Sequence, residues 1–527
     1  MHRRELGKSH RLIHRREALK VAALTGSSLW LGAGLYGCAD SNDEDFEAGV
    51  QTDDLNDGGV PLFAGGLTTS LLEERRYQAA VRGRLPRELR GTLYKNGPGL
   101  FDRAGVRRRT LLDGDGLITA YRFADGRVEF QNRFVRTPKF EAEQAAGRFL
   151  VDSWTTPLDE QGTVEDDTQS GVTVWPWGER LYAFDENSAC WELSPNDLET
   201  VGKATFGLGE DEAAFFAHGK QLAGSAEFSL FGVRYGKLQY NYAVLDPEQR
   251  SRVARSFPVT DYGPPSYMHD WFVTPRFFVL HLMPAILDGE AIGGGSVLRD
   301  AIDWQPALPS RLLVFRRDDL EARPQVFEMD PAWMWHSVNA FERSDSELVL
   351  DWIGYDDPHH FVGAGAEWEL IMQGELVRTG APGVLRRSVL DLSAGRLSTE
   401  RYEDLDDQEF PVVAPDRVGQ AYRYTYLVHD PGAGVLYQSV AKIDLESGRH
   451  QTFDFGAGRI ALEPTFVPRP GGRSEDDGWL LVEVANANTG RASLCVFDAR
   501  AIEDGPIARV MLEHHVPMRF HGRWAPG

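Results

Sequence analysis

The feature that most limits the fold of this chain is a long succession of short extended segments. From Val60 onward, runs rich in β-branched and aromatic residues alternate with turn sequences, for example at 127–134, 180–184, 311–315, 348–353, 435–443 and 479–484. Ala124-Asp125-Gly126, Ser393-Ala394-Gly395 and Glu446-Ser447-Gly448-Arg449 each separate two such runs. Long amphipathic helices and a regular βαβ alternation are missing from the pattern, which argues against a parallel sheet. The sequence therefore predicts an all-β protein.

An all-β body of about 470 residues must close on itself or repeat radially to protect its sheet edges. A β-propeller with a few short helices or loops capping one face meets this demand. The sequence carries no WD or kelch-type repeat signature, so two β-sandwich domains remain the alternative on pattern alone.

Composition limits the partners of this body. The chain has 527 residues, of which 42% are hydrophobic, and a formal net charge of -23. Its first 37 residues carry seven Lys and Arg against two Glu, so the remainder has a net charge of -28. Such a surface repels nucleic acid and anionic lipid but suits neutral, apolar substrates. Three cysteines exclude a disulfide framework and an all-cysteine metal cage.

The N-terminus has the pattern of a targeting segment. Arg15 and Arg16 precede an apolar run at 21–36 that is too short and Gly-rich for a comfortable spanning helix. The segment resembles a twin-arginine export signal, although Ala18 stands where that pattern usually has Phe, and the run ends in a lipobox-like sequence before Cys38. An uncleaved anchor helix is the alternative.

These features predict three parts of the chain. Residues 1–37 form the export signal, 38–59 form an acidic, disordered tether with too little apolar area to order itself, and 60–527 form the propeller domain. With Cys38 lipidated, we expect an exported lipoprotein held at the periplasmic or outer side of a bacterial membrane.

Four of the fourteen histidines stand out by context. These four, His218, His269, His336 and His521, lie beside bulky aromatic residues at the edges of extended runs. Other histidines, such as His359, His360 and His450, lie in polar loops. The separations of 51, 67 and 185 residues between the four exclude a compact finger and suit one ligand from each of several distant strands. Neutral imidazoles favour first-row metals such as Fe, Cu or Zn. For any one of them taken alone, a buried core histidine is the alternative.

Three glutamates lie in apolar or proline-fixed surroundings where a solvated carboxylate is not expected, namely Glu186, Glu409 and Glu463. An imidazole ligand usually has its second ring nitrogen anchored, often on a carboxylate. The three glutamates are candidates for this role, and surface solvation is the alternative for each.

Longer motifs in a fixed order resemble the carotenoid cleavage oxygenase family. The similarity runs from about Leu62 to the C-terminus and rests on residues 91–99, 113–116, 132–137, 269–270, 336–342, 463–469 and 521–524. The resemblance implies a seven-bladed propeller with a non-haem Fe(II) on its axis. It also implies that His218, His269, His336 and His521 are the ligands, and that Glu186, Glu409 and Glu463 hold the ligands in place. His218 is followed by Gly219 where the family usually has Pro, which predicts a looser backbone beside this ligand.

The implied reaction is cleavage of a carbon–carbon double bond by O2 to give two carbonyl products. Four neutral ligands leave Fe(II) its full charge and two open positions, so oxygen activation must draw on an electron-rich substrate such as a conjugated alkene. No protein general acid or base is required. A non-oxidative isomerase or hydrolase on the same iron, and a non-catalytic binding propeller, are the other functional classes.

The sequence says less about the substrate. A lipid anchor favours a membrane-dissolved carotenoid or apocarotenoid, whereas relatives in the family cleave stilbenoids, which need polar anchors. The segment 282–287 is either an apolar lip at the substrate entrance or a packed excursion between strands, and the second is preferred.

Overall fold

The computed structural model describes residues 66–209, 213–234, 239–246, 251–375, 377–432 and 436–527. The expected export signal (1–37), Cys38 and the tether (38–59) lie outside the described residues. Within the described ranges, no helix combines the length and the apolar character that a membrane crossing needs.

Antiparallel sheets make up most of the regular structure, as the succession of extended segments predicts. The largest sheet has ten strands: β30 (Arg459–Ala461), β31 (Thr465–Pro468), β32 (Gly478–Asn486), β33 (Arg491–Asp498), β34 (Ala508–Met511), β1 (Arg76–Gly83), β6 (Arg127–Phe134), β5 (Leu117–Ala124), β2 (Gly91–Lys95) and β35 (Gly522–Pro526). Two of the four four-stranded sheets come earlier in the chain: β7 (Thr173–Trp177), β8 (Arg180–Phe184), β10 (Cys190–Leu193) and β11 (Thr200–Ala204), then β16 (Trp271–Val273), β17 (Phe277–Leu282), β20 (Ser310–Arg316) and β21 (Gln325–Met329). Two more follow: β22 (Trp333–Glu342), β23 (Glu347–Tyr355), β24 (Val384–Asp391) and β25 (Arg396–Tyr402), then β26 (Gln408–Val412), β27 (Tyr424–His429), β28 (Ser439–Asp444) and β29 (His450–Asp454).

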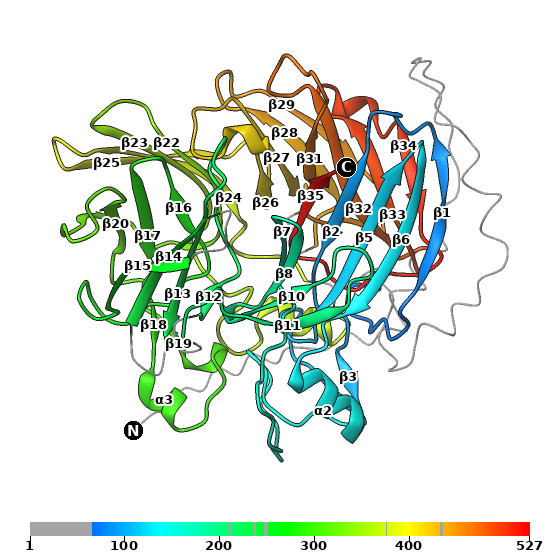
Figure 1. The fold of residues 1–527 in the computed structure, drawn as a ribbon. Coiled ribbons are helices and arrows are strands. Elements are labelled where there is room, and N and C mark those ends of the chain that lie inside the picture. The colour runs from blue at the N-terminus through cyan, green and yellow to red at the C-terminus, as the bar shows by residue number, and fades with distance from the viewer. Residues whose placement is uncertain (1–65, 210–212, 235–238, 247–250, 376, 433–435) are drawn as a thin grey trace, which may run out of the picture. The chain divides into compact units, whose positions relative to one another are not determined.

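Smaller sheets complete the architecture. One has three strands: β13 (Phe228–Arg234), β14 (Gln239–Leu245) and β15 (Ser251–Pro258). Three are two-stranded: β3 (Asp102–Arg103) with β4 (Val106–Arg107), β9 (Asn187–Ser188) with β12 (Phe215–Phe216), and β18 (Ala285–Leu287) with β19 (Ile302–Trp304). Figure 1 shows the sheets following one another in a ring, from β7–β11 through the green and yellow sheets to β32–β34 and β1. The all-β propeller prediction is confirmed, and two separate sandwich domains were the wrong alternative.

The expected number of separate blades was wrong. Among the described residues, five sheets have four or more strands, rather than seven. One reason is β1, which pairs with β6 at its start and with β34 at its end, so that strands from the beginning and the end of the chain form one continuous sheet. A second reason is that β13, β14 and β15 form a sheet of only three strands.

Short helices lie outside the sheets. The described α-helices are α2 (Pro138–Ala146), α3 (Gly289–Gly293) and α4 (Glu367–Met372), and the described 3-10 helices are η6 (Arg299–Ala301), η7 (Pro415–Arg417) and η8 (Ile502–Asp504). In Figure 1, α2 and α3 lie at the same lower side of the ring. Thr137 caps α2 by accepting a hydrogen bond from the backbone N–H of Phe140 at 3.1 Å, and Gly147 ends the helix in the left-handed conformation.

The three turn predictions are confirmed. Asp125 and Gly126, with φ of 52° and 75°, join β5 to β6 in the left-handed conformation that a two-residue hairpin favours. The turn at 393–395 joins β24 to β25, and the turn at 446–449 joins β28 to β29.

The structure tests the expectations for two segments, 435–443 and 282–287. In the described part of the extended run expected at 435–443, the strand begins at Ser439. Leu436 and Tyr437, which precede it, line a cavity. The segment 282–287 is a packed excursion, since Met283 and Leu287 are buried and β18 pairs with β19. The preferred interpretation of this segment was correct.

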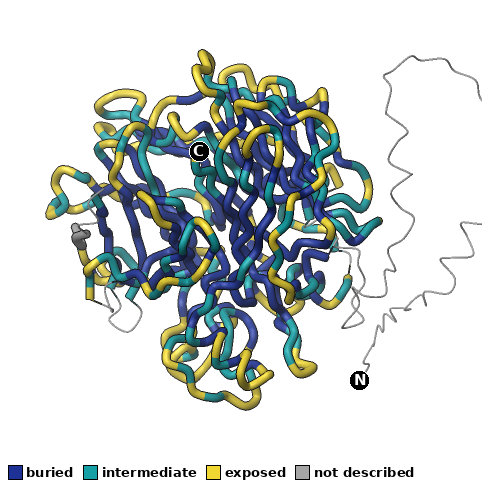
Figure 2. Tube along the Cα trace, turned by 45° about the vertical axis from the view of Figure 1, so that its right-hand side comes forward, coloured by how far each residue is buried: buried dark blue, intermediate teal, exposed yellow. Residues whose placement is uncertain are grey.

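The C-terminal strand closes the ring. β35 pairs along its whole length with β2, from Gly91 opposite Pro526 to Lys95 opposite Gly522. Figure 2 shows that buried residues follow the strands, whereas exposed residues collect in the loops. The end of the chain is therefore held in a sheet.

Candidate metal centre

The four histidines singled out in the sequence meet at one point in the ring. One side-chain atom from each of His218, His269, His336 and His521 lies within 4.8 Å of the others, and all four residues are buried. The Nε2 atoms of His218 and His269 are 2.9 Å apart, and those of His336 and His521 are 3.1 Å apart. Such close nitrogen atoms make a cluster that a metal ion could share.

The fold explains why residues so distant in sequence meet. His336 lies in β22, His269 comes just before β16, and His521 comes just before β35. Each of these three strands is the edge strand of its sheet. Edge strands of neighbouring sheets touch in the structure, as β16 and β22 do, and as β22 and β26 do. The inner edges of the sheets thus deliver the histidines to the centre of the ring.

Three buried carboxylates hold three of the imidazoles. Glu186 accepts a hydrogen bond from Nδ1 of His269 at 2.7 Å, and Glu463 accepts one from Nδ1 of His521 at 2.8 Å. Glu409 hydrogen-bonds Nδ1 of His336. The three glutamates are at most 5% exposed, so none has the surface role that was the alternative. A carboxylate on Nδ1 leaves the Nε2 lone pair directed at the cluster.

The electrostatics of the cluster favour neutral imidazoles at two positions. Burial, with smaller contributions from the other three histidines, holds the pKa of His218 well below its usual value. Burial also lowers the pKa of His521 to about 3, despite the opposing charge of Glu463. Burial alone would raise the pKa of Glu463, but His521 and Lys95 outweigh it and lower that pKa to about 2. At neutral pH, Glu463 is ionised and His521 has a lone pair free for a metal.

A mainly apolar cavity lies against the histidines. Its lining includes His269, His336 and His521 and is otherwise mostly apolar: Leu67, Leu111, Leu112, Val172, Trp335, Trp368, Phe410, Leu436, Ile460, Ala461, Leu462, Met518 and Phe520, with Tyr355, Tyr437 and Glu409 as the polar members. An apolar lining with a few polar groups is the usual composition of a small-molecule binding site in a protein.

Phe410 covers the cluster from the cavity side in a strained conformation. Its ring centroid lies 5.2 Å from that of His336 and 5.7 Å from that of His521. Its φ is 50°, and the pairing of β26 with β27 shifts register between Glu409 and Val412. Irregular strand geometry of this kind often occurs at functional sites, where it redirects side chains. Here it allows Glu409 to reach His336 while Phe410 faces the cavity.

Comparison with known proteins identifies the family. The family model described as retinal pigment epithelial membrane protein matches residues 68–526. The chain belongs to this family.

Similar relatives in the family are oxygenases by name. The chain is 30% identical to apocarotenoid-15,15'-oxygenase of Synechocystis, over 84% of this chain and 92% of that protein. It is 27% identical to lignostilbene-alpha,beta-dioxygenase isozyme III of Sphingomonas paucimobilis, over 84% and 93% of the two chains. The crystal structure of cobalt-substituted Synechocystis apocarotenoid oxygenase superposes with a TM-score of 0.80 at 30% identity, covering 88% of this chain and 98% of that one. The resemblance to carotenoid cleavage oxygenases is thus confirmed at the level of the family.

The departure from the family pattern at Gly219 has a steric reason. A Cβ atom there would lie 2.2 Å from Cζ and 2.5 Å from Cε2 of Phe228. Gly219 does not have a positive φ, so it is needed for space and not for backbone freedom. Phe228 packs closely against this glycine, and the expected loosening of the backbone beside His218 stays a prediction.

Replacing Gly219 with Ala is expected to destabilise the apo-protein by about 1–3 kcal/mol, the usual cost of overpacking a core, and to lower metal content. Urea unfolding and metal analysis measure the two effects. The double variant Gly219→Ala/Phe228→Leu, which removes the clashing ring atoms, should recover most of both. Gly202→Ala is the matched control, since a Cβ there meets no atom within 4 Å. Equal stability of Gly219→Ala and the wild type would contradict the steric explanation.

Several residues around the cluster escaped the sequence analysis. His360 was placed in a polar loop but is only 4% exposed, and it accepts a hydrogen bond at 2.6 Å from the indole of Trp335, a cavity residue. Tyr267 donates a hydrogen bond at 2.5 Å to Glu186. Asp270 was visible as the neighbour of His269, but only the fold shows its contacts. These partners depend on contacts between distant segments, which no local pattern reveals.

Proposed function

We propose that this protein is a non-haem Fe(II) dioxygenase that cleaves a carbon–carbon double bond of a carotenoid or apocarotenoid into two carbonyl products. The observation that carries the proposal is the cluster of four buried histidines at the wall of an apolar cavity. Two similar relatives are named for the oxygenation of an apocarotenoid and of a lignostilbene, which supports the reaction class.

The donor set fits a first-row transition metal. His218, His269, His336 and His521 offer nitrogen atoms within 4.8 Å of one another, and imidazole suits iron. When bound, Fe(II) at the centre of the ring would supply the activation of O2. The protein supplies the rest of the site. Glu186, Glu409 and Glu463 fix the ring orientation of three ligands by accepting from Nδ1.

The cavity residues hold and shield the alkene. Apolar side chains such as Trp335, Phe410 and Phe520 exclude water and contact hydrocarbon, so a conjugated chain can lie next to His336 and His521. The reaction consumes one O2 and one alkene and forms two carbonyl groups, so it needs no external reductant. It also requires no net proton transfer, and the proposal assigns no general acid or base.

A stilbenoid substrate is the second candidate. Tyr355 and Tyr437 line the cavity, and a hydrogen bond joins their side chains. Burial raises the pKa of both phenols well above the usual value, so both hydroxyl groups keep their protons. A protonated tyrosine can donate to or accept from a phenolic substrate. These two residues are the polar anchors that a stilbenoid would use.

The test is anaerobic reconstitution of the full chain with Fe(II), followed by a mixed panel of apocarotenoids and stilbenes. We expect cleavage with one O2 consumed per alkene. In 18O2, each product should carry one labelled oxygen after immediate reduction of the carbonyls to alcohols, which prevents exchange with water. Mass spectrometry then identifies both the substrate and the cleaved bond. Isomerised product without O2 uptake would instead support the isomerase class, and no turnover with any alkene would contradict the proposal.

We further propose that residues 60–527 act outside the cytoplasm. The twin-arginine segment at 1–37, a lipidated Cys38 and the acidic tether at 38–59 would hold the domain near a membrane surface. This position supports a substrate dissolved in lipid.

Replacing Arg15 and Arg16 together with Lys is expected to leave the protein in the cytoplasm, because the paired arginines are the feature on which the export hypothesis depends. Cell fractionation with immunodetection measures the effect, and Arg3→Lys/Arg4→Lys is the matched control. Cys38→Ser should separately prevent metabolic labelling with a fatty acid. Normal export of the Arg15/Arg16 variant would contradict the twin-arginine hypothesis.

A further inference from the structure

His218 differs from the other three histidines in how it is held. Among the residues that the structure describes, no carboxylate hydrogen-bonds its imidazole, whereas His269, His336 and His521 each have one. The imidazole must therefore be positioned by its own main chain and by packing. This raises the question of what fixes the backbone at His218.

The carboxylate of Asp270 joins the segments that follow three of the histidines. Its Oδ1 accepts from the backbone N–H of Trp271 at 2.7 Å and pairs with Nζ of Lys220 at 2.6 Å. Its Oδ2 accepts from the backbone N–H and the hydroxyl of Ser337 at 2.8 Å and 2.6 Å. Lys220 lies two residues after His218, and Ser337 directly follows His336. Asp270 is 2% exposed and has a donor on every side.

Two further contacts tie this carboxylate to His218. The indole N–H of Trp271 donates to the backbone carbonyl of His218 at 2.7 Å. The ammonium of Lys220 also donates to the hydroxyl of Ser337 at 2.9 Å, so the cation closes a small network with Asp270. The backbone of Lys220 exchanges two hydrogen bonds of 2.8 Å with Ser229. The chain is thus fixed on both sides of the peptide that follows His218.

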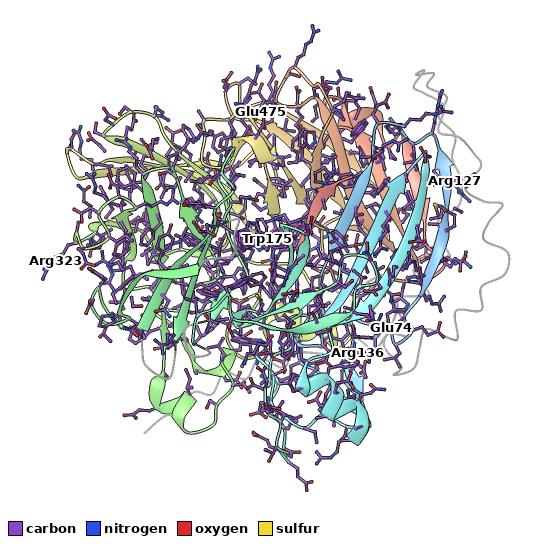
Figure 3. The ribbon with its side chains drawn as sticks, in the orientation of Figure 1. Glu74, Arg127, Arg136, Trp175, Arg323 and Glu475 are labelled. Carbon is purple, nitrogen blue, oxygen red and sulfur yellow. The ribbon has the colours of Figure 1, made fainter. Side chains whose placement is uncertain are left out.

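The segment that follows the fourth histidine carries a charge that Asp270 influences. Asp270 and Arg523, two residues after His521, interact electrostatically, and the guanidinium of Arg523 lies 4.3 Å from the ring centroid of Trp175. Trp175 is labelled near the middle of the view in Figure 3. Asp270 therefore interacts with residues that follow each of the four histidines.

We propose that Asp270, through Lys220 and Trp271, is the positioning residue for His218 and takes the place of the glutamate that this histidine lacks. The inference rests on the proposed metal site. Because all of its polar neighbours are donors, a carboxylate is the group that fits. An amide in its place would direct an N–H against another donor and release Lys220. Loss of this anchor should weaken metal binding in the way that loss of an outer hydrogen-bond partner does.

The experiment measures Co2+ binding by the apo form of the full chain, by competition with a chelator at a temperature far below unfolding. The variants are Asp270→Asn, Lys220→Met and the conservative Lys220→Arg. The matched control is Asp351→Asn, which removes an equally buried carboxylate. Asp351 lies in β23 and accepts two hydrogen bonds, of 2.8 Å and 2.9 Å, from Arg387 in β24. The hydroxyl of Tyr422 donates a third hydrogen bond to it at 2.6 Å. The visible d–d spectrum of bound Co2+ is the second measurement, since it reports the geometry of the ligands and not the stability of the fold.

We expect about a 10- to 100-fold loss of Co2+ affinity and a changed spectrum for Asp270→Asn and Lys220→Met, with near wild-type values for Lys220→Arg and Asp351→Asn. Wild-type affinity and spectrum in Lys220→Met and Asp270→Asn would overturn the inference while leaving the proposed function intact. If Asp270→Asn does not fold, wild-type Co2+ affinity in Lys220→Met alone would overturn the inference. An equal loss in Asp351→Asn would also overturn it, because the effect would then be general. If the wild type takes up no stoichiometric metal, the proposed function fails and this inference fails with it.

Discussion

Replacing His336 with Ala is expected to abolish metal retention and alkene cleavage together. The change removes one of four nitrogen ligands, and it leaves the buried Glu409 without the imidazole that it hydrogen-bonds. Losing a hydrogen bond to a buried charged group costs about 1.5–3 kcal/mol, so the apo-protein should also be less stable than the wild-type apo-protein. Metal analysis after dialysis, product formation under air and urea unfolding measure the three effects.

His281→Ala is the matched control for this experiment. His281 is also fully buried on a strand, in β17, and burial lowers its pKa to about 3, but it packs edge-on against Trp352 and not in the cluster. This variant should lose some stability through the cavity it creates while keeping its metal. Stoichiometric metal in His336→Ala would count decisively against the proposed ligand set.

Removing residues 521–527 is expected to have the second large effect. It deletes His521 together with β35, which pairs along its whole length with β2. It also removes Trp524, which packs against the largest hydrophobic cluster. Metal binding should be lost, and the unfolding temperature of the metal-free protein should fall by several degrees, since the exposed edge of β2 and the lost apolar burial both destabilise the fold.

The point variant His521→Ala separates the two contributions. It removes the nitrogen ligand and leaves β35 in place, so its metal-free form should unfold at a clearly higher temperature than the truncated chain. Differential scanning calorimetry of both apo-proteins makes the comparison. Equal unfolding temperatures would show that β35 adds nothing to stability beyond its histidine.

The residues at the centre of the site could be selected from the sequence because their local context is unusual. His218, His269, His336 and His521 lie beside aromatic residues at the ends of extended runs, and Glu186, Glu409 and Glu463 lie in apolar surroundings. An ionisable side chain in such a context needs a partner. The structure brings all seven together, and it pairs each glutamate with one histidine, which the sequence could not specify.

Other parts of the site were beyond sequence reasoning for a physical reason. The anchoring role of Asp270 depends on Lys220 and Ser337, which lie far away along the chain and meet it only in the folded ring. Tyr437 was expected within a strand, but its side chain faces the cavity. The number of separate sheets depends on whether β1 pairs with one strand or with both β6 and β34. This pairing is set by hydrogen bonds between distant segments, which the alternation of hydrophobic residues does not encode.

The double pairing of β1 and the pairing of β2 with β35 have a consequence for how the chain folds. β1 finds one of its two partner strands near residue 510, and β2 finds one of its two near residue 524, so these contacts rank among the longest-range in the fold. Contacts of this kind form slowly, because a large loop must close before they stabilise anything. Until then, β1 and β2 present unpaired backbone groups that can associate with other chains. Aggregation during synthesis is therefore the characteristic hazard of this architecture.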